Sequence, residues 1–288
     1  MTTVDKVESE IVSGKPGKVS PRQLASGGLV RYLPLIMLAV IIIVIGILSP
    51  NFLTARNAIN ILRQSAALGL MAIGMTAVLV GGGIDLSLPS VMAFSGILGA
   101  MYMRDGGNPV LAAAIMIVVG TLSGCINGFA VAYLRMIPFV VTLAMMNIAM
   151  GASIWITESV SVAPINQGFI DVVMAKFSII PIPVIFGTYA FSGFMAGMAA
   201  IVVVARLMSA APTMGEEGVV LDIVSSAVIG GVSIYGGVGS PLGAVIGALF
   251  ITLITNSMNM LKISYYTTLV VKGLVIIAAV ALDSLRRR

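Results

Sequence analysis

The sequence predicts an all-α fold, a polytopic bundle of transmembrane helices with glycine-rich breaks. The first observation is composition, because the 288 residues are 59% hydrophobic and only 9% charged, with a mean hydropathy of +1.11. Soluble domains carry about 25% charged residues. The second is length, since the apolar residues fall into about nine segments, most near the length that crosses a bilayer as a helix. The third is that clusters of glycine interrupt the apolar sequence at two places.

Charged residues gather at the two ends and divide the chain into three regions. Residues 1–32 hold five Lys or Arg and three acids among polar residues, which predicts a disordered cytoplasmic tail. Residues 33–282 form the transmembrane domain. Residues 283–288 form a second basic tail, which is expected in the cytoplasm because basic residues favour that side. The net charge of +5 therefore concerns topology, and no nucleic-acid partner is expected.

The residue types that are missing exclude several functions. The chain has no histidine, which excludes histidine-based metal sites and histidine acid/base chemistry. Its one cysteine, Cys125, cannot form an intramolecular disulfide. The few charged residues at membrane depth are too scattered for a recognisable nucleophile or acid/base site. We therefore expect no enzyme activity, no metal site and no cofactor.

The first expected span is Leu33–Ser49, and the basic tail before it places its far end outside. Thr54–Ser65 follows with polar residues at helical spacing. This pattern fits a short interfacial helix, and it fits equally the solvated start of the second span, Ser65–Val80. The third expected span, Val91–Met103, runs outward to a polar turn at Arg104–Asn108.

Residues 81–90 form the first glycine break, between the second and third spans. The three glycines loosen the backbone, and Pro89 has no N–H for a preceding turn. Within a membrane, broken backbone is tolerated where it is buried in protein or lines a wet cavity, and an acid there suggests a functional site. Asp85 or Ser87 caps the next helix, either as its only role or while also lining a transport path. The candidate path residues here are Gly82, Gly83, Asp85 and Ser87.

The fourth and fifth expected spans are Pro109–Tyr133 and Ile137–Thr157. In the fourth, glycines recur every four residues and predict close packing of another helix. These are Gly120, Gly124 and Gly128. Trp155 fits an aromatic anchor at the outer end of the fifth span. The more polar Glu158–Ser178 is expected to be an outside loop with a short helix.

The apolar stretch at the start of the second half of the chain is too short to form two spans. Ile179–Ala205 has 27 residues without a charge. As a helix this stretch would be about 40 Å long, enough for one span, whereas two spans need about 40 residues. Gly193 and Gly197 within it predict another close-packing face.

A second glycine break, residues 230–240, follows a loop at Arg206–Gly218 and an apolar segment at Val219–Gly231 that is too short to span alone. The first break at 82–86 resembles residues 230–234, and glycine-interrupted segments in corresponding positions of two halves indicate a transporter's pathway. The candidate path residues of this half are Asp222, Gly230, Gly231, Ser233, Gly236 and Gly237.

Two further spans close the sequence. Pro241–Met260 carries Gly243 and Gly247, which we assign to helix packing. Thr267–Leu282 carries Lys272 near its start, which we expect to snorkel to the interface, the alternative being that it meets an acid inside the bundle.

Seven short segments, taken together and in order, resemble permease subunits of the ribose/xylose/arabinose-type bacterial ABC sugar importers, the binding-protein-dependent inner membrane components. They are residues 51–54, 82–87, 205–213, 221–223, 230–234, 236–239 and 271–273. The resemblance implies a multi-pass permease in the bacterial inner membrane, in contact with membrane lipid, which transports a pentose or related polyol by alternating access. It also implies a homodimer, a periplasmic sugar-binding protein and a cytoplasmic ATP-binding-cassette ATPase. No Walker-type phosphate loop is present in this sequence, so the partner ATPase binds the ATP.

The sequence departs from the family pattern in three places. Pro89 stands where the family commonly has Gly, and Val220 where it often has Glu. Near Gly187, family members carry an additional segment, roughly the 40 residues that two spans require, which completes a span and docks on the ATPase. We therefore interpret the chain as an internally deleted permease with impaired coupling. Nine spans, where the family has ten, would place Arg286–Arg288 outside, so that either the second half inverts or one segment does not cross.

Two other functions remain open from the sequence. One is an ion-coupled secondary transporter, in which Asp85, Asp222 and Lys272 form a proton or ion relay. The other is a truncated permease that does not transport and only assembles with a full-length one.

Overall fold

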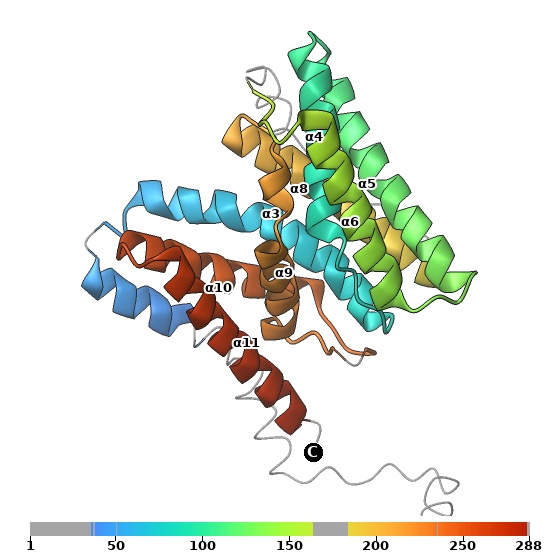
Figure 1. Ribbon diagram of the computed structural model, residues 1–288. Coiled ribbons are helices and arrows are strands. Elements are labelled where there is room, and N and C mark those ends of the chain that lie inside the picture. Colours follow the sequence, from blue (N-terminus) through green and yellow to red (C-terminus); the bar gives the residue numbers. More distant parts are fainter. Residues whose placement is uncertain (1–35, 37, 50, 164–183, 235, 287–288) are drawn as a thin grey trace, which may run out of the picture.

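The computed structural model describes residues 36–286 apart from 37, 50, 164–183 and 235. This part of the chain is helical and contains no β-strand beyond one isolated β-bridge, which confirms the all-α prediction. Five of its helices are long and apolar enough to cross a membrane: α3, α5, α6, α8 and α10. The helices are Leu38–Leu48, α3 (Ala55–Val80), α4 (Leu88–Arg104), α5 (Pro109–Ala132), α6 (Pro138–Thr157), α8 (Val184–Leu207), η1 (Pro212–Gly215), α9 (Glu217–Ile229), α10 (Pro241–Met260) and α11 (Tyr265–Arg286) (Figure 1).

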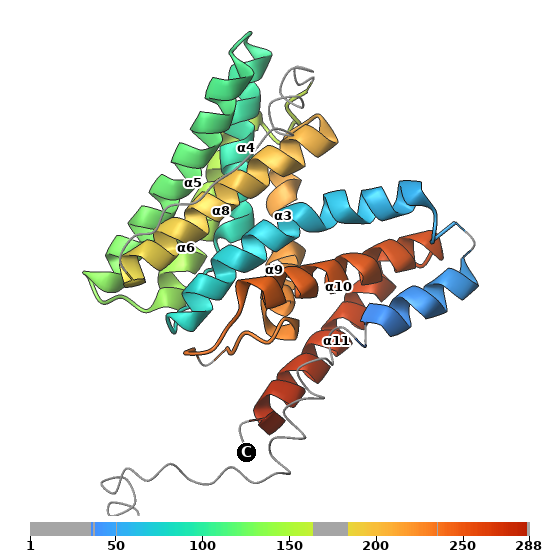
Figure 2. The same ribbon diagram turned by 180° about the vertical axis from the view of Figure 1, so that it is seen from behind.

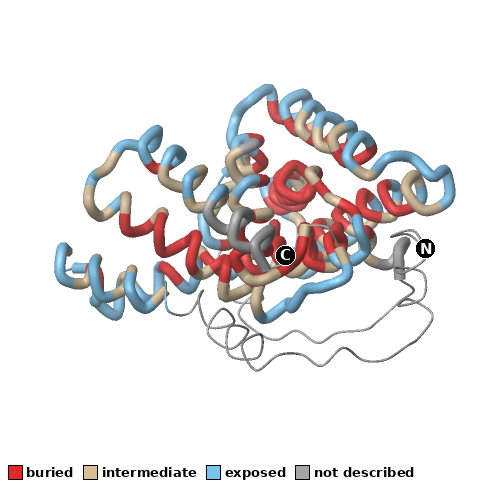
Figure 3. Tube along the Cα trace, turned by 90° about the horizontal axis from the view of Figure 1, so that it is seen from below, coloured by how far each residue is buried: buried red, intermediate tan, exposed pale blue. Residues whose placement is uncertain are grey.

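The helices form two packed groups. α4, α5, α6 and α8 stand beside one another, while α3 and α10 lie side by side and cross beneath them (Figures 1 and 2). The two groups meet where α3 packs against α8, and α9 packs against both α3 and α10. Buried residues gather toward the middle of the bundle and exposed ones lie at its edges (Figure 3). Many exposed side chains on α5 and α6 are large and apolar, as expected for helices that face lipid.

Helix α3 is continuous from Ala55 to Val80. Thr54 is its N-cap, and its hydroxyl oxygen accepts a hydrogen bond from the Asn57 N–H at 3.3 Å. The polar stretch Thr54–Ser65 is therefore the solvated start of the second span, with Arg56 and Arg63 exposed. The expectation of a separate interfacial helix is not met, because one cap begins the whole helix.

The direction of α8 is fixed by a single β-bridge. Val162, after α6, and Ala210, after α8, exchange backbone hydrogen bonds of 2.8 and 3.1 Å. The two helices therefore end on the same side and run in the same direction. Residues 164–183 lie outside the described residues, and with them most of the loop expected at Glu158–Ser178. The single span expected within Ile179–Ala205 is present as α8, from Val184 to Leu207.

The second half is not inverted relative to the first. α10 runs antiparallel to α3, since Asn256 near its end donates a hydrogen bond of 3.1 Å to the side chain of Asn57 near the start of α3. α11 begins at Tyr265, directly after the turn 261–264, on the side where α3 begins. α11 therefore runs back from that side, and the cytoplasmic position of the basic residues after 282 stays a prediction.

Candidate functional site

The two helices that lead into the glycine breaks end with the same hydrogen bonds. At the end of α3, Gly82 N–H donates to Leu79 O at 2.9 Å and Gly83 N–H to Val78 O at 3.0 Å. At the end of α9, the corresponding bonds run from Gly231 to Val228 at 2.9 Å and from Val232 to Ala227 at 3.0 Å. Gly82 and Gly231 have φ of +79° and +87°. Both ends are therefore Schellman motifs, which need a left-handed residue that glycine supplies without strain.

The hydrogen bonds at the two helix ends pair the residues of the breaks one position differently from the sequence match. Gly82 corresponds to Gly231, and Gly83 to Val232, whereas matching the sequences paired Gly82 with Gly230. The reason is that the helix end sets the register, and Gly230 is the C-cap residue equivalent to Gly81.

The two breaks touch each other. The Gly237 N–H donates a hydrogen bond of 3.1 Å to Val80 O, the last carbonyl of α3. A Cβ built on Gly236 would lie 3.2 Å from the Cα of Gly82. Gly236 and Gly237 also have positive φ, at +88° and +78°. The ends of α3 and α9 thus form one junction, which we call the glycine junction (residues 81–87, 230–234 and 236–240).

Asp85 is buried at this junction, with 1% of its surface exposed. Its Oδ1 accepts hydrogen bonds from the N–H and the hydroxyl of Ser87, at 3.0 and 2.6 Å. Its Oδ2 accepts one from the Ser192 hydroxyl on α8, at 2.8 Å. The amide of Asn127 on α5 donates to the Ser87 hydroxyl oxygen at 2.9 Å. The carboxylate therefore ties the first break to α8 directly and to α5 through Ser87.

The capping expectation is met only in part. Ser87 is the N-cap of α4, but its side chain makes no capping hydrogen bond to that helix. Asp85 instead accepts the N–H of the cap residue itself. Its role in a transport path stays a prediction. The partners Ser192 and Asn127 were missed by sequence reasoning, although a lone amide inside the apolar span 109–133 was a signal for Asn127.

Tyr189 of α8 explains why residue 83 is glycine. The ring is 2% exposed, and its hydroxyl makes no hydrogen bond with the described residues. A Cβ on Gly83 would collide with that hydroxyl and lie 3.1 Å from Cζ. The close approach of a buried ring therefore excludes any side chain at this position.

The glycines assigned to packing lie at helix contacts. A Cβ on Gly120 of α5 would lie 2.8 Å from Gly197 N, and one on Gly124 would lie 3.0 Å from Gly193 Cα, so α5 and α8 meet backbone to backbone. On α10, a Cβ on Gly243 would collide with Gly230 O. Gly247 likewise meets Ser226 O of α9, and Gly128 is buried.

Asp222 and Lys272 form an ion pair. Lys272 Nζ of α11 lies 2.8 Å from Asp222 Oδ2 of α9, with side chains 13% and 20% exposed. The expectation that Lys272 snorkels is wrong, because an acid lies within its reach inside the bundle. Ser233, also a candidate path residue, is buried, and its N–H donates to Val238 O at 2.8 Å within the second break. Among the described residues, Asp85 and Asp222 share no bonding partner, so a continuous relay between them is not supported.

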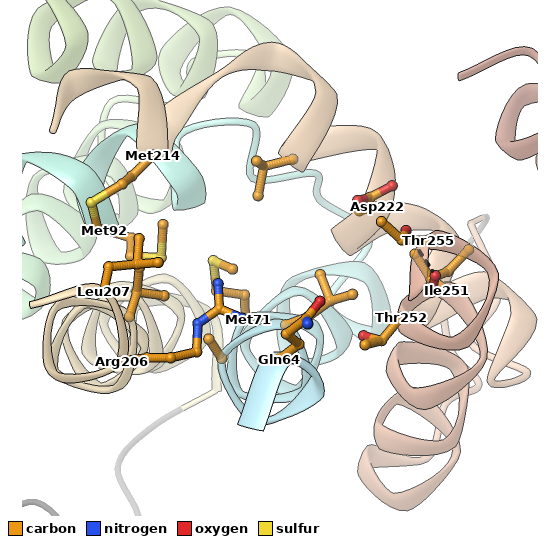
Figure 4. Close-up of a pocket in the computed structure, with 14 residues that line it drawn as sticks. Gln64, Met71, Met92, Arg206, Leu207, Met214, Asp222, Ile251, Thr252 and Thr255 are labelled. Carbon is orange, nitrogen blue, oxygen red and sulfur yellow. Dashed lines mark hydrogen bonds between the residues drawn. The ribbon is translucent and has the colours of Figure 1, made fainter. Parts of the chain in front are cut away.

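A cavity of about 250 Å³ opens between α3, α8, α9 and α10, with Asp222 on its wall (Figure 4). Its wall on α3 ends at Met71, about 14 Å along the helix before Val80, whereas Met92 of α4 lies only five residues after Ser87 of the glycine junction.

Comparison with known proteins decides the family. Residues 57–185 and 170–280 match the family described as the permease component of branched-chain amino acid transport systems. The chain belongs to this family. The ribose import permease protein of Escherichia coli K12 is 32% identical over 326 residues, covering 96% of this chain and 98% of that protein. The D-allose transport system permease protein of the same strain is 34% identical, covering 88% and 92%. The ribose import permease protein of Bacillus subtilis is 34% identical, covering 87% and 91%. No solved structure matches the chain.

The aligned length bears on the expected deletion. The 326 aligned residues exceed the 288 of this chain, so the Escherichia coli ribose permease has positions without a counterpart here. The two family matches also meet and overlap at 170–185, beside Gly187. With its apolar helices and family, the chain is a multi-pass membrane permease.

Proposed function

We propose that the chain is the permease of an ATP-binding-cassette importer that moves a monosaccharide, a pentose or related polyol, across the bacterial inner membrane. The carrying observation is similarity along most of its length to permeases named for ribose and allose. Transport proceeds by alternating access around the glycine junction, where two broken helices meet in the bundle. An ion-coupled transporter is less well supported, since Lys272 neutralises Asp222 and neither residue bonds to Asp85.

The permease works with three partners. A periplasmic sugar-binding protein delivers the substrate, and a cytoplasmic ATPase binds the ATP, since the chain has no phosphate loop. The second copy of the permease completes a homodimer. The exposed apolar surface of α5 and α6 is available for lipid or for that copy.

Coupling to the ATPase is impaired in this chain. The alignment with the Escherichia coli ribose import permease runs over 326 positions, whereas this chain has 288 residues, so that protein has positions without a counterpart here. The two family matches meet at 170–185, beside Gly187. The segment expected to dock on the ATPase is the one missing at this place.

Co-purification with the cognate ATPase in detergent tests this proposal. A repaired chain carries, near Gly187, the additional segment of the Escherichia coli ribose permease, and a control chain carries a Gly/Ser insert of equal length. Capture of the ATPase by the repaired chain alone, with sugar uptake in vesicles, supports a sugar permease with lost coupling. Equal capture by the unaltered chain overturns the coupling proposal. Absence of uptake by an inserted, dimeric repaired chain contradicts the transport function and favours a non-transporting permease.

A further inference from the structure

The cavity beside Asp222 has an outer position that suits an entering solute. Its walls come from the middle of α3, the first turns of α4, the end of α8, η1, the start of α9 and the second half of α10. The bridge between Val162 and Ala210 places the end of α8 on the outer side, with the end of α6. Arg206 and Leu207, at the end of α8, are exposed at the cavity's edge. At its other end the cavity reaches Met92 of α4, five residues after Ser87 of the glycine junction.

Several polar groups around this cavity are unused. In Figure 4, Arg206 and Gln64 point into it from one side, and Asp222 and Thr252 line the other. The side chains of Arg206, Gln64 and Thr252 make no hydrogen bond with any residue that the structure describes, although Thr252 is only 5% exposed. Asp222 bonds to Lys272 through Oδ2, which leaves Oδ1 as an acceptor. The cavity thus offers hydrogen-bond donors and an acceptor from four helices, α3, α8, α9 and α10.

The apolar residues of the lining and its charges indicate which class of ligand the cavity would bind. Met71, Met92 and Met214 provide adaptable apolar wall, which suits the C–H faces of a small ring. Lys272 neutralises Asp222, so Arg206 is the one cation on the lining without an ion pair to a described residue. An acid on the same wall disfavours a polyanion such as phosphate. The volume of about 250 Å³ lies below the range of about 300–1,000 Å³ for drug-sized ligands, so it fits a small, neutral, polyhydroxylated molecule.

We propose that this cavity is a monosaccharide-binding site at the outer entrance of a single protomer, where Arg206, Gln64, Thr252 and Asp222 Oδ1 hydrogen-bond the sugar hydroxyls. The site rests on the proposed sugar permease function. It also gives a task to two segments of the family pattern, residues 205–213 and 221–223, which meet at its wall.

Equilibrium binding to the full chain in lipid nanodiscs tests the site, without ATPase or binding protein. The probes are radiolabelled D-ribose, D-allose and L-arabinose. Arg206→Gln should weaken binding about tenfold or more, and Thr252→Val about two- to tenfold, since a charge-assisted hydrogen bond contributes more than a neutral one. Ala67→Leu, which fills the wall without removing a polar group, should abolish binding.

Two matched controls lie outside the cavity. Arg63→Gln changes an exposed arginine of α3, and Thr121→Val removes a hydroxyl that already donates to Ile117 O at 2.7 Å on α5. Both should bind sugar as the unaltered chain does, and all variants are checked for an unchanged melting temperature. Should Ala67→Leu fail to fold, the two polar variants decide.

The outcomes separate this site from the proposed function. Binding of none of the three sugars, or equal binding by folded Arg206→Gln and Thr252→Val, overturns the site even if the repaired importer transports sugar. Loss of binding-protein capture by Arg206→Gln with unchanged sugar affinity overturns it as well. Binding with the expected losses, in a repaired importer that takes up no sugar, supports the site and contradicts the transport function.

Discussion

The two glycine breaks begin alike and are held differently. Both follow a Schellman motif with a left-handed glycine, Gly82 or Gly231. The first break is short and is fixed by side chains, with Asp85 accepting bonds from Ser87 and Ser192. The second is longer, has no acid, and is fixed by backbone bonds such as that from Gly237 to Val80 O.

The first break is thus fixed by a buried side-chain network, and the second break lies against it through a backbone hydrogen bond. Residues 237–240 of the second break are exposed, whereas Asp85 and Ser87 are buried. A shift of the first break would leave the donors of Ser87 and Ser192 without their carboxylate acceptor, which makes that break costly to move. The second break contains no carboxylate, so the cost of moving it does not include this loss.

Among substitutions in the two breaks, Asp85→Ala should lower the free energy of unfolding most. It leaves the donors of Ser87 and Ser192 unsatisfied in a buried site, and we expect a loss of about 3–5 kcal/mol in the free energy of unfolding. Ile234→Ala, at the corresponding place of the second break, should cost about 1 kcal/mol. Denaturant unfolding in detergent measures both.

The matched control for Asp85 is Asp85→Asn, which keeps the shape and one acceptor and should fall between the two. Unchanged stability of Asp85→Ala together with lost sugar uptake in the repaired importer would show that Asp85 lines the path rather than anchoring the break.

Gly83→Ala should lower stability by an intermediate amount, and the loss should depend on Tyr189. The new Cβ collides with the Tyr189 hydroxyl, and overpacking of this kind costs about 1–3 kcal/mol. Tyr189→Phe removes a hydroxyl with no partner among the described residues, so alone it should be neutral or stabilising. The double variant should therefore recover much of the loss, as a double-mutant cycle of melting temperatures would show. Strict additivity would contradict the contact.

Gly82→Ala and Gly231→Ala should have the smallest and most similar effects. Neither Cβ would meet an atom within 4 Å, so only the positive φ is penalised, by about 1–2 kcal/mol. Gly151→Ala in α6 is the control, also with open space around it, and should be neutral or slightly stabilising as a helix-interior change. Unequal losses at Gly82 and Gly231 would break the equivalence of the two helix ends.

Local signals predicted most of the fold but little of the site's bonding. The helices at 109–132 and 241–260 follow from apolar length and from proline at their starts. The contacts of Gly120 and Gly193 lie on small-residue faces that spacing alone predicts. The partner of Asp85 lies 107 residues away and that of Lys272 50 away, and no periodicity indicates either distance.

The sequence by itself determined the membrane class, the family, the places of both breaks and the packing glycines, because composition, helix-ending residues and small-residue spacing act locally. The tertiary structure decided the direction of α8, the one-residue shift between the breaks, the pairing of Lys272 with Asp222, and the outer cavity. Each of these depends on which distant helices pack together, and that is settled by the fit of whole helix faces rather than by any one segment.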